Sequence, residues 1–125
     1  MNTSLITTHV LDTALGRPAS AVPVSLSQLS DDAGGSPHVW SVLATAVTDH
    51  NGRVENFDSA RDIGPAALPA GRYRLVFDTE AYFSLTSTES FFSEITIVFT
   101  VTEDGKHYHV PLLLSPFAYS TYRGN

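Results

Sequence analysis

The sequence predicts an all-β protein, an eight-stranded β-sandwich of two sheets with one short helix. Hydrophobic residues make up 42% of the 125 residues and charged residues only 16%, and strand-forming Val, Thr, Phe and Tyr are well represented. Short apolar or alternating runs follow one another along the chain, separated by turn residues. A single stretch carries the start signal of a helix. At this length we expect one domain over residues 1–125.

The N-terminal half is expected to hold four strands. Three cover residues 4–12, 22–29 and 39–48, and a short fourth strand begins at Arg53. The first strand is followed by a turn with both Gly and Pro at 13–18, and the second by residues 30–37, which are rich in loop-forming types. Asp49-His50-Asn51-Gly52 is the strongest hairpin signal, because Asn-Gly accepts the positive φ angles of a type I′ turn. Arg53 is therefore expected to leave a hairpin directly.

The C-terminal half is expected to hold the helix and four more strands. The helix covers residues 78–83, where Asp78 or Thr79 caps it and Glu80 lies in its first turn. Strands are expected over 71–77, 91–102 and 108–114, and a last one follows the Ser115-Pro116 turn. Residues 58–70 are irregular, and Asp104-Gly105 marks a turn.

Alternation assigns a core face and an outward face to two of these strands. In the first, Ile6, Thr8 and Val10 oppose His9 and Leu11. The strand at 108–114 places Tyr108, Val110, Leu112 and Leu114 on the core face, and His109, Pro111 and Leu113 on the other. Because proline donates no hydrogen bond to a sheet, the face with His109 is expected to meet a partner or a ligand.

Composition excludes several classes of protein. The chain has no cysteine, which rules out disulfides and thiolate metal sites. Its formal charge of −6 argues against nucleic-acid binding, which needs a basic surface. No signal peptide, membrane-spanning run or terminal Ser-Lys-Leu is visible, so we expect a cytoplasmic protein that binds no membrane.

Five histidines raise the question of zinc. His107 and His109 are two residues apart on one strand face, a spacing that permits chelation. A third ligand would have to come from His9, His38 or His50, and no spacing selects one of them. We therefore expect no metal site and interpret His107, His38 and His50 as solvated turn residues. Nucleophile-elbow and phosphate-loop motifs are absent too.

Two segments resemble the signature stretches of the transthyretin family. They are HVLDTALGRPASAVPV at 9–24 and YHVPLLLSPFAYSTYRGN at 108–125. The order of the expected strands and the helix after residue 77 also fits this family. The resemblance implies a sandwich of two four-stranded sheets and a homotetramer, a dimer of dimers with a central channel.

The family has two functional branches, a vertebrate hormone carrier and a hydrolase of 5-hydroxyisourate. The hydrolase pattern is matched at His9, Arg53, His109 and Tyr122-Arg123-Gly124. Two departures exist, since Asn125 replaces the usual terminal Ser and Ala118 replaces Gly or Ser. The resemblance therefore implies the hydrolase branch.

What this resemblance implies is hydrolysis of the N1–C6 amide of 5-hydroxyisourate to 2-oxo-4-hydroxy-4-carboxy-5-ureidoimidazoline, in urate degradation. His9 and His109 would activate water and move protons, and Arg53 would bind and polarise the substrate. Ser120, Tyr122 and Arg123 would complete substrate binding, without metal or organic cofactor. The alternative is a non-enzymatic, thyroid-hormone-like carrier of a small ligand in the same channel.

Overall fold

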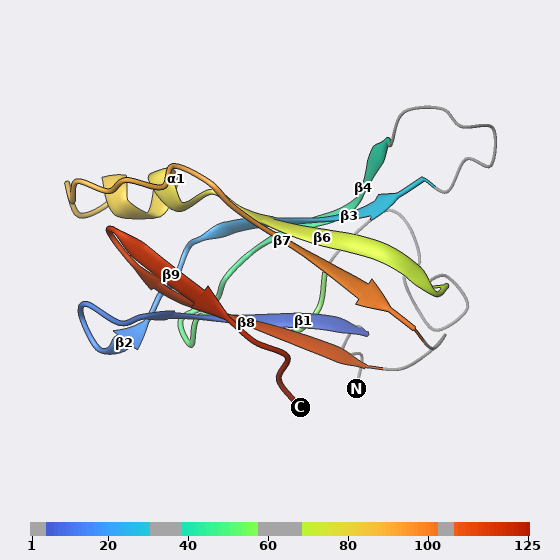
Figure 1. Ribbon diagram of the computed structural model, residues 1–125. Coiled ribbons are helices and arrows are strands. Elements are labelled where there is room, and N and C mark those ends of the chain that lie inside the picture. Colours follow the sequence, from blue (N-terminus) through green and yellow to red (C-terminus); the bar gives the residue numbers. More distant parts are fainter. Residues whose placement is uncertain (1–4, 31–38, 58–68, 103–106) are drawn as a thin grey trace.

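The computed structural model describes residues 5–30, 39–57, 69–102 and 107–125, arranged as two β-sheets that pack face to face (Figure 1). The expected sandwich with one short helix is confirmed in this part of the chain. The predictions for residues 30–37, 58–70 and 103–106 fall wholly or largely outside the described residues, and His38 does so as well.

The first sheet has the order β2-β1-β8-β9, and β5 also pairs with β1. Strands β1 and β8 run parallel and the other pairs are antiparallel. Its members are β1 (Ile6–Asp12), β2 (Arg17–Pro18), β5 (Arg53–Val54), β8 (Tyr108–Ser115) and β9 (Ala118–Thr121).

Within the described residues the first sheet therefore has five strands instead of the four that were expected. The additional strand is β2, which lies within the predicted turn at 13–18. It forms because the chain folds back tightly enough for Arg17 and Pro18 to pair with Asp12 and Leu11.

The second sheet has the order β4-β3-β6-β7, with antiparallel neighbours throughout. It is formed by β3 (Pro23–Leu29), β4 (Trp40–Val47), β6 (Gly71–Phe77) and β7 (Ile95–Val101). These four strands correspond to predicted ones. Strand β7 is shorter than expected, because the backbone before it bonds elsewhere: Phe91 N–H donates to the Pro116 carbonyl over 2.8 Å.

The helix α1 (Thr79–Ser84) begins where the sequence predicts. Asp78 caps it, since the Asp78 carboxylate accepts a hydrogen bond from the Ala81 N–H over 3.1 Å. Its buried side chains include Tyr82 and Phe83, which hold the helix against the sandwich. No helix in the described ranges is long and apolar enough to cross a membrane.

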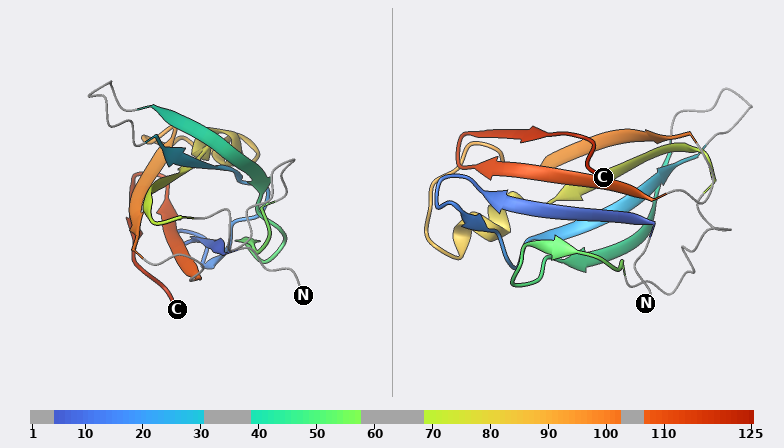
Figure 2. Two further views of the ribbon diagram at one scale, coloured as in Figure 1. Left: turned by 90° about the vertical axis from the view of Figure 1, so that its right-hand side faces the viewer. Right: turned by 90° about the horizontal axis from the view of Figure 1, so that it is seen from below.

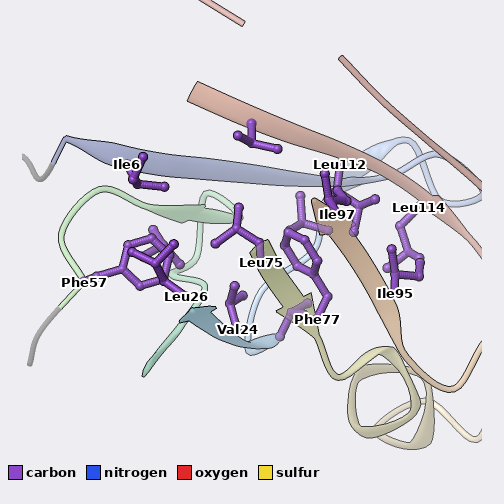
Figure 3. Close-up of a cluster of buried hydrophobic side chains, with 14 of the residues drawn as sticks. Ile6, Val24, Leu26, Phe57, Leu75, Phe77, Ile95, Ile97, Leu112 and Leu114 are labelled. Carbon is purple, nitrogen blue, oxygen red and sulfur yellow. The ribbon is translucent and has the colours of Figure 1, made fainter. Parts of the chain in front are cut away.

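The hydrophobic core fills the space between the two sheets (Figure 3). As predicted, β8 buries Tyr108, Val110, Leu112 and Leu114, but Pro111, which was expected on the outward face, is buried as well. Leu75 and Phe77 of β6 are fully buried as well. Burial of each such side chain contributes about 1.5–3 kcal/mol. The core thus fixes which side chains of the first sheet face away from it. Two rotated views show the two sheets that enclose this core (Figure 2).

The turn at Asp49–Gly52 differs from the predicted hairpin. Gly52 alone has a positive φ (75°) in this turn, so it is not type I′, and β5 pairs with β1 instead of β4. Gly52 lies against the β1 backbone: its carbonyl accepts the Val10 N–H over 2.7 Å. A Cβ at this position would be 2.4 Å from the Val10 oxygen. The chain therefore crosses from the second sheet to the first here, and this crossing brings Arg53 beside His9.

Candidate active site

Three strands of the first sheet place polar side chains on one outward face. His9 of β1 is paired with Arg53 of β5 on one side and with Pro111 of β8 on the other. Thr7, two residues before His9, is paired with His109. Because directly paired residues point to the same side of a sheet, these side chains gather on the face away from the core.

A cleft of about 160 Å³ opens at this cluster. This cleft is smaller than the pockets of about 300–1,000 Å³ that usually enclose a small molecule. His9 flanks the cleft closely enough for its charge to act on His109. The lining residues are Thr7, Thr8, Arg53, Glu55, His107, His109 and Asn125.

The Thr7 hydroxyl lies between two imidazoles. Its Oγ1 is 2.8 Å from Nδ1 of His109 and 2.9 Å from Nε2 of His107. The two rings are nearly parallel, with 18° between their planes and 6.4 Å between their centroids. His107 is exposed, as the sequence indicates, but its ring lines the cleft and is hydrogen-bonded to Thr7.

Burial and a neighbouring cation keep both candidate catalytic imidazoles neutral. Desolvation is the main cause that lowers the pKa of His109 below 6.5, and the Arg53 guanidinium is the next. The pKa of His9 is lowered by the same two causes, opposed by a hydrogen bond to the Asn51 backbone and by the Asp49 carboxylate. At neutral pH each ring therefore has a nitrogen lone pair that accepts a proton.

Asp49 holds the backbone from which Arg53 projects. Its Oδ1 accepts the N–H of Asn51 over 2.8 Å and the N–H of Arg53 over 3.0 Å. The bond from Arg53 is the largest cause that lowers the pKa of the Asp49 carboxyl, which therefore stays ionised. The turn thus fixes the position of the arginine at the start of β5.

The C-terminal segment crosses directly over His109. The Gly124 N–H donates to the His109 carbonyl over 2.8 Å. A Cβ on Gly124 would lie 2.7 Å from Cδ2 of the His109 ring and 3.3 Å from Cγ of Pro111. Glycine is therefore required here for space, and its close approach carries Asn125 to the cleft.

The remaining predicted site residues lie around this cluster in different ways. The Arg123 guanidinium stacks 4.9 Å over the Tyr108 ring. Arg123 and Tyr122 both line a second cleft, of about 330 Å³, that includes His109. Ser120 is exposed on β9, paired with Leu113, and lines neither cleft. The structure thus brings His9, Arg53 and His109 together and leaves Ser120 apart.

Sequence reasoning did not select Thr7 or Glu55 as site residues, and it considered His107 only as a metal ligand. Thr7 and His107 each precede a selected histidine by two residues, and this spacing places them on the same strand face. That signal was available for both. Glu55 follows β5, beyond any periodic pattern.

No group of three or more His, Cys, Asp or Glu residues within the described ranges is placed to hold a metal ion. Nε2 of His107 and Nδ1 of His109 both face the Thr7 hydroxyl.

Fold and site together define a small two-sheet β-sandwich with an imidazole and arginine cluster on the outer face of one sheet. The chain matches the family model described as HIUase/Transthyretin family over residues 6–124. It belongs to this family.

Relatives from both branches resemble the chain along nearly all of its length. The 5-hydroxyisourate hydrolase of Mus musculus is 41% identical over 122 residues, which cover 98% of this chain and 96% of the mouse protein. The structure of Klebsiella pneumoniae 5-hydroxyisourate hydrolase is 39% identical, with a TM-score of 0.74, covering 96% of this chain and 98% of that one. Sea bream transthyretin in complex with thyroxine is 35% identical, with a TM-score of 0.79, covering 95% and 93%.

Proposed function

We propose that this protein is a 5-hydroxyisourate hydrolase. The observation that carries the proposal is the convergence of His9, Arg53 and His109 on one sheet face, brought about by the pairing of β1 with β5 and β8. Hydrolases of this name from mouse and Klebsiella pneumoniae are similar over nearly the whole chain. The hydrolase reading therefore rests both on the site and on the similarity.

The site supports a hydrolysis that proceeds through an activated water molecule. A neutral imidazole of His9 or His109 would take a proton from water as it attacks the substrate amide, a contribution of about 10²- to 10⁴-fold. The carbonyl oxygen becomes negatively charged in the tetrahedral intermediate, and the planar guanidinium of Arg53 would stabilise this charge. The protonated imidazole would then return the proton to the leaving nitrogen, which opens the ring.

A carrier function is the second candidate, because the fold is also similar to a transthyretin solved with thyroxine. Backbone similarity does not separate the two functions. The cluster of two neutral imidazoles with an arginine favours hydrolysis, since a carrier needs no group that takes a proton from water.

Assembly as a homotetramer, a dimer of dimers, is part of the proposal. Its support is the small cleft of about 160 Å³, which lies open on the outer face of the first sheet. A second copy packed against this face would enclose the substrate. Sedimentation analysis is expected to give a tetramer, and a fully active monomer would refute this assembly.

The decisive experiment follows the absorbance of freshly generated 5-hydroxyisourate with and without the protein. A hydrolase accelerates its decay in proportion to protein concentration. Equilibrium dialysis against thyroxine tests the carrier in parallel. Thyroxine binding without accelerated decay would overturn the proposed function and favour the carrier.

A further inference from the structure

The contacts of Thr7 carry an inference about the proton positions in the site. A threonine hydroxyl has one hydrogen to donate, and here its oxygen lies within 3 Å of a ring nitrogen on each of two histidines. It therefore cannot donate to both. In one arrangement it donates to His109 and accepts from His107. In the other it donates to His107 and accepts from His109.

These two arrangements give His109 opposite chemical properties. When Thr7 donates to His109, Nδ1 is the bare nitrogen and Nε2 carries the proton, so that Nε2 is no base. When Thr7 donates to Nε2 of His107, it accepts the Nδ1–H of His109 and leaves Nε2 of His109 as a bare lone pair. Of these two, the second arrangement is the one that leaves Nε2, the ring nitrogen that does not face Thr7, free to accept a proton.

The Arg53 cation lines the same cleft as His109 and disfavours a second proton on its ring, an effect that favours neither neutral tautomer over the other. One feature of the site favours the second arrangement. A hydrogen bond to the Thr7 backbone favours the protonated form of His109. A backbone group has this effect when its carbonyl accepts from a ring N–H, and Nδ1 is the nitrogen that lies against Thr7.

The geometry points to Thr7 as a positioning residue that, anchored by His107, holds His109 in the Nδ1–H tautomer and leaves Nε2 free to take the proton of the attacking water. This inference rests on the proposed hydrolase function for its kinetic consequences only. The role resembles that of a carboxylate that orients a catalytic histidine, with a neutral hydroxyl and a second histidine in its place. His107 thereby acquires a role although it is exposed and lies just before β8.

The tautomer is measured directly by ¹⁵N NMR of the imidazole nitrogens at neutral pH in the unmodified protein. We expect a pyridine-type signal for Nε2 of His109 and a pyrrole-type signal for Nδ1. The opposite pattern would overturn the inference, whatever the enzymatic activity. Because this measurement needs neither a variant nor a substrate, its outcome is independent of the proposed function.

Two substitutions at Thr7 separate orientation from packing. Thr7→Val keeps the shape of the buried side chain and removes the hydroxyl, whereas Thr7→Ser keeps the hydroxyl. Thr7→Val should mix the His109 tautomers and lower kcat by about 10- to 100-fold, the scale known for partners that orient metal-bound histidines. KM should change little, and Thr7→Ser should restore most of kcat.

Controls keep the test valid if Thr7→Val folds poorly. His107→Phe alters an exposed position and removes the anchor, so it should also mix the tautomers and lower kcat. Thr79→Val removes another buried hydroxyl, which donates to the Phe92 carbonyl over 2.6 Å far from the cleft, and should lower stability alone. An unchanged tautomer and unchanged kcat in both Thr7→Val and His107→Phe would refute the inference while leaving the hydrolase function intact. Absence of hydrolase activity in the unmodified protein would refute only the proposed hydrolase function.

Discussion

The outward faces of the two sheets differ in chemistry. On the first sheet, the Thr7 hydroxyl is hydrogen-bonded to both His107 and His109, beside Arg53. On the second, the half-buried Arg74 stacks 4.5 Å over the Trp40 ring, and its Nε has no hydrogen-bond partner among the described residues. One arginine acts on the protonation of nearby imidazoles and the other packs on an aromatic ring. Alternation of side chains along a strand thus provides an outward face. A site forms only where pairing between strands brings suitable side chains together on that face.

Substitution of the two arginines tests this contrast most strongly. Arg53→Ala should lower kcat/KM by about 2 to 4 kcal/mol, the scale of losing a donor to a developing oxyanion. The matched Arg74→Ala removes a half-buried arginine from the other sheet and should leave kcat/KM unchanged. Steady-state kinetics on both variants, with circular dichroism to confirm folding, checks this expectation.

His109→Asn should have an effect of similar size, because it removes a proton acceptor while the position faces away from the core. Equal losses in Arg53→Ala and Arg74→Ala would mean that activity reflects general stability, and the distinction between the two faces would then fail.

Gly124 gives the next largest expected effect. Gly124→Ala places a Cβ 2.7 Å from the His109 ring, so the ring or the C-terminal segment must move. We expect kcat/KM to fall by about 10- to 100-fold, as small misplacements of catalytic groups typically cost. Gly16→Ala is the control: Gly16 has a φ of +70°, but nothing lies within 4 Å of its Cβ position. It should reduce stability by about 1–2 kcal/mol and leave activity unchanged.

Deletion of residues 122–125 provides a harsher version of the same experiment. It removes the crossing over His109 together with the Arg123–Tyr108 stack. Unchanged activity in this deletion, with folding intact, would exclude the C-terminal segment from the site.

How much the sequence predicts depends on the range over which its physical signal acts. Period-two alternation is local, and it correctly assigned Tyr108, Val110 and Leu112 to the core and His109 to the outward face. The N-cap of α1 at Asp78 was also predictable, because its hydrogen bond spans only three residues.

Features set by packing between strands were not predictable in the same way. The Asn-Gly signal indicated a hairpin, but contact of Gly52 with the β1 backbone directs β5 to the other sheet. The position of Arg53 beside His9 follows from this contact, and the sequence alone suggested it only through the family resemblance. The Thr7 bridge joins residues about a hundred positions apart, so no local pattern reports it.

A polar contact on the core side of the first sheet should affect stability and not activity. The Tyr82 hydroxyl donates to Oδ2 of the buried Asp12 over 2.6 Å, and burial, followed by this contact, raises the pKa of Tyr82. Tyr82→Phe leaves the carboxylate oxygen without its donor and should lower the free energy of unfolding by about 1–3 kcal/mol. Tyr119→Phe, at an exposed tyrosine of β9, should change it by less than about 0.5 kcal/mol. Urea denaturation measures both, and a loss of kcat/KM in folded Tyr82→Phe would contradict the separation of core and site.

The smallest expected effect concerns the pH dependence of kcat/KM. Burial and Arg53 lower the pKa of both His9 and His109 below the ordinary 6.5, so the neutral, proton-accepting form persists to lower pH than in a free imidazole. The acid limb of kcat/KM should therefore lie below pH 6.5, with activity lost as pH falls through the lowered pKa values.

Arg53→Ala removes one cause of the lowered pKa and leaves desolvation, which should move the acid limb of its residual activity to higher pH. Arg74→Ala should leave the limb in place, because Arg74 is not among the charges that act on either ring. An acid limb at the same pH in Arg53→Ala and in the unmodified protein would show that Arg53 does not lower the pKa of these imidazoles. The two arginines would then not differ in their electrostatic effect on the site.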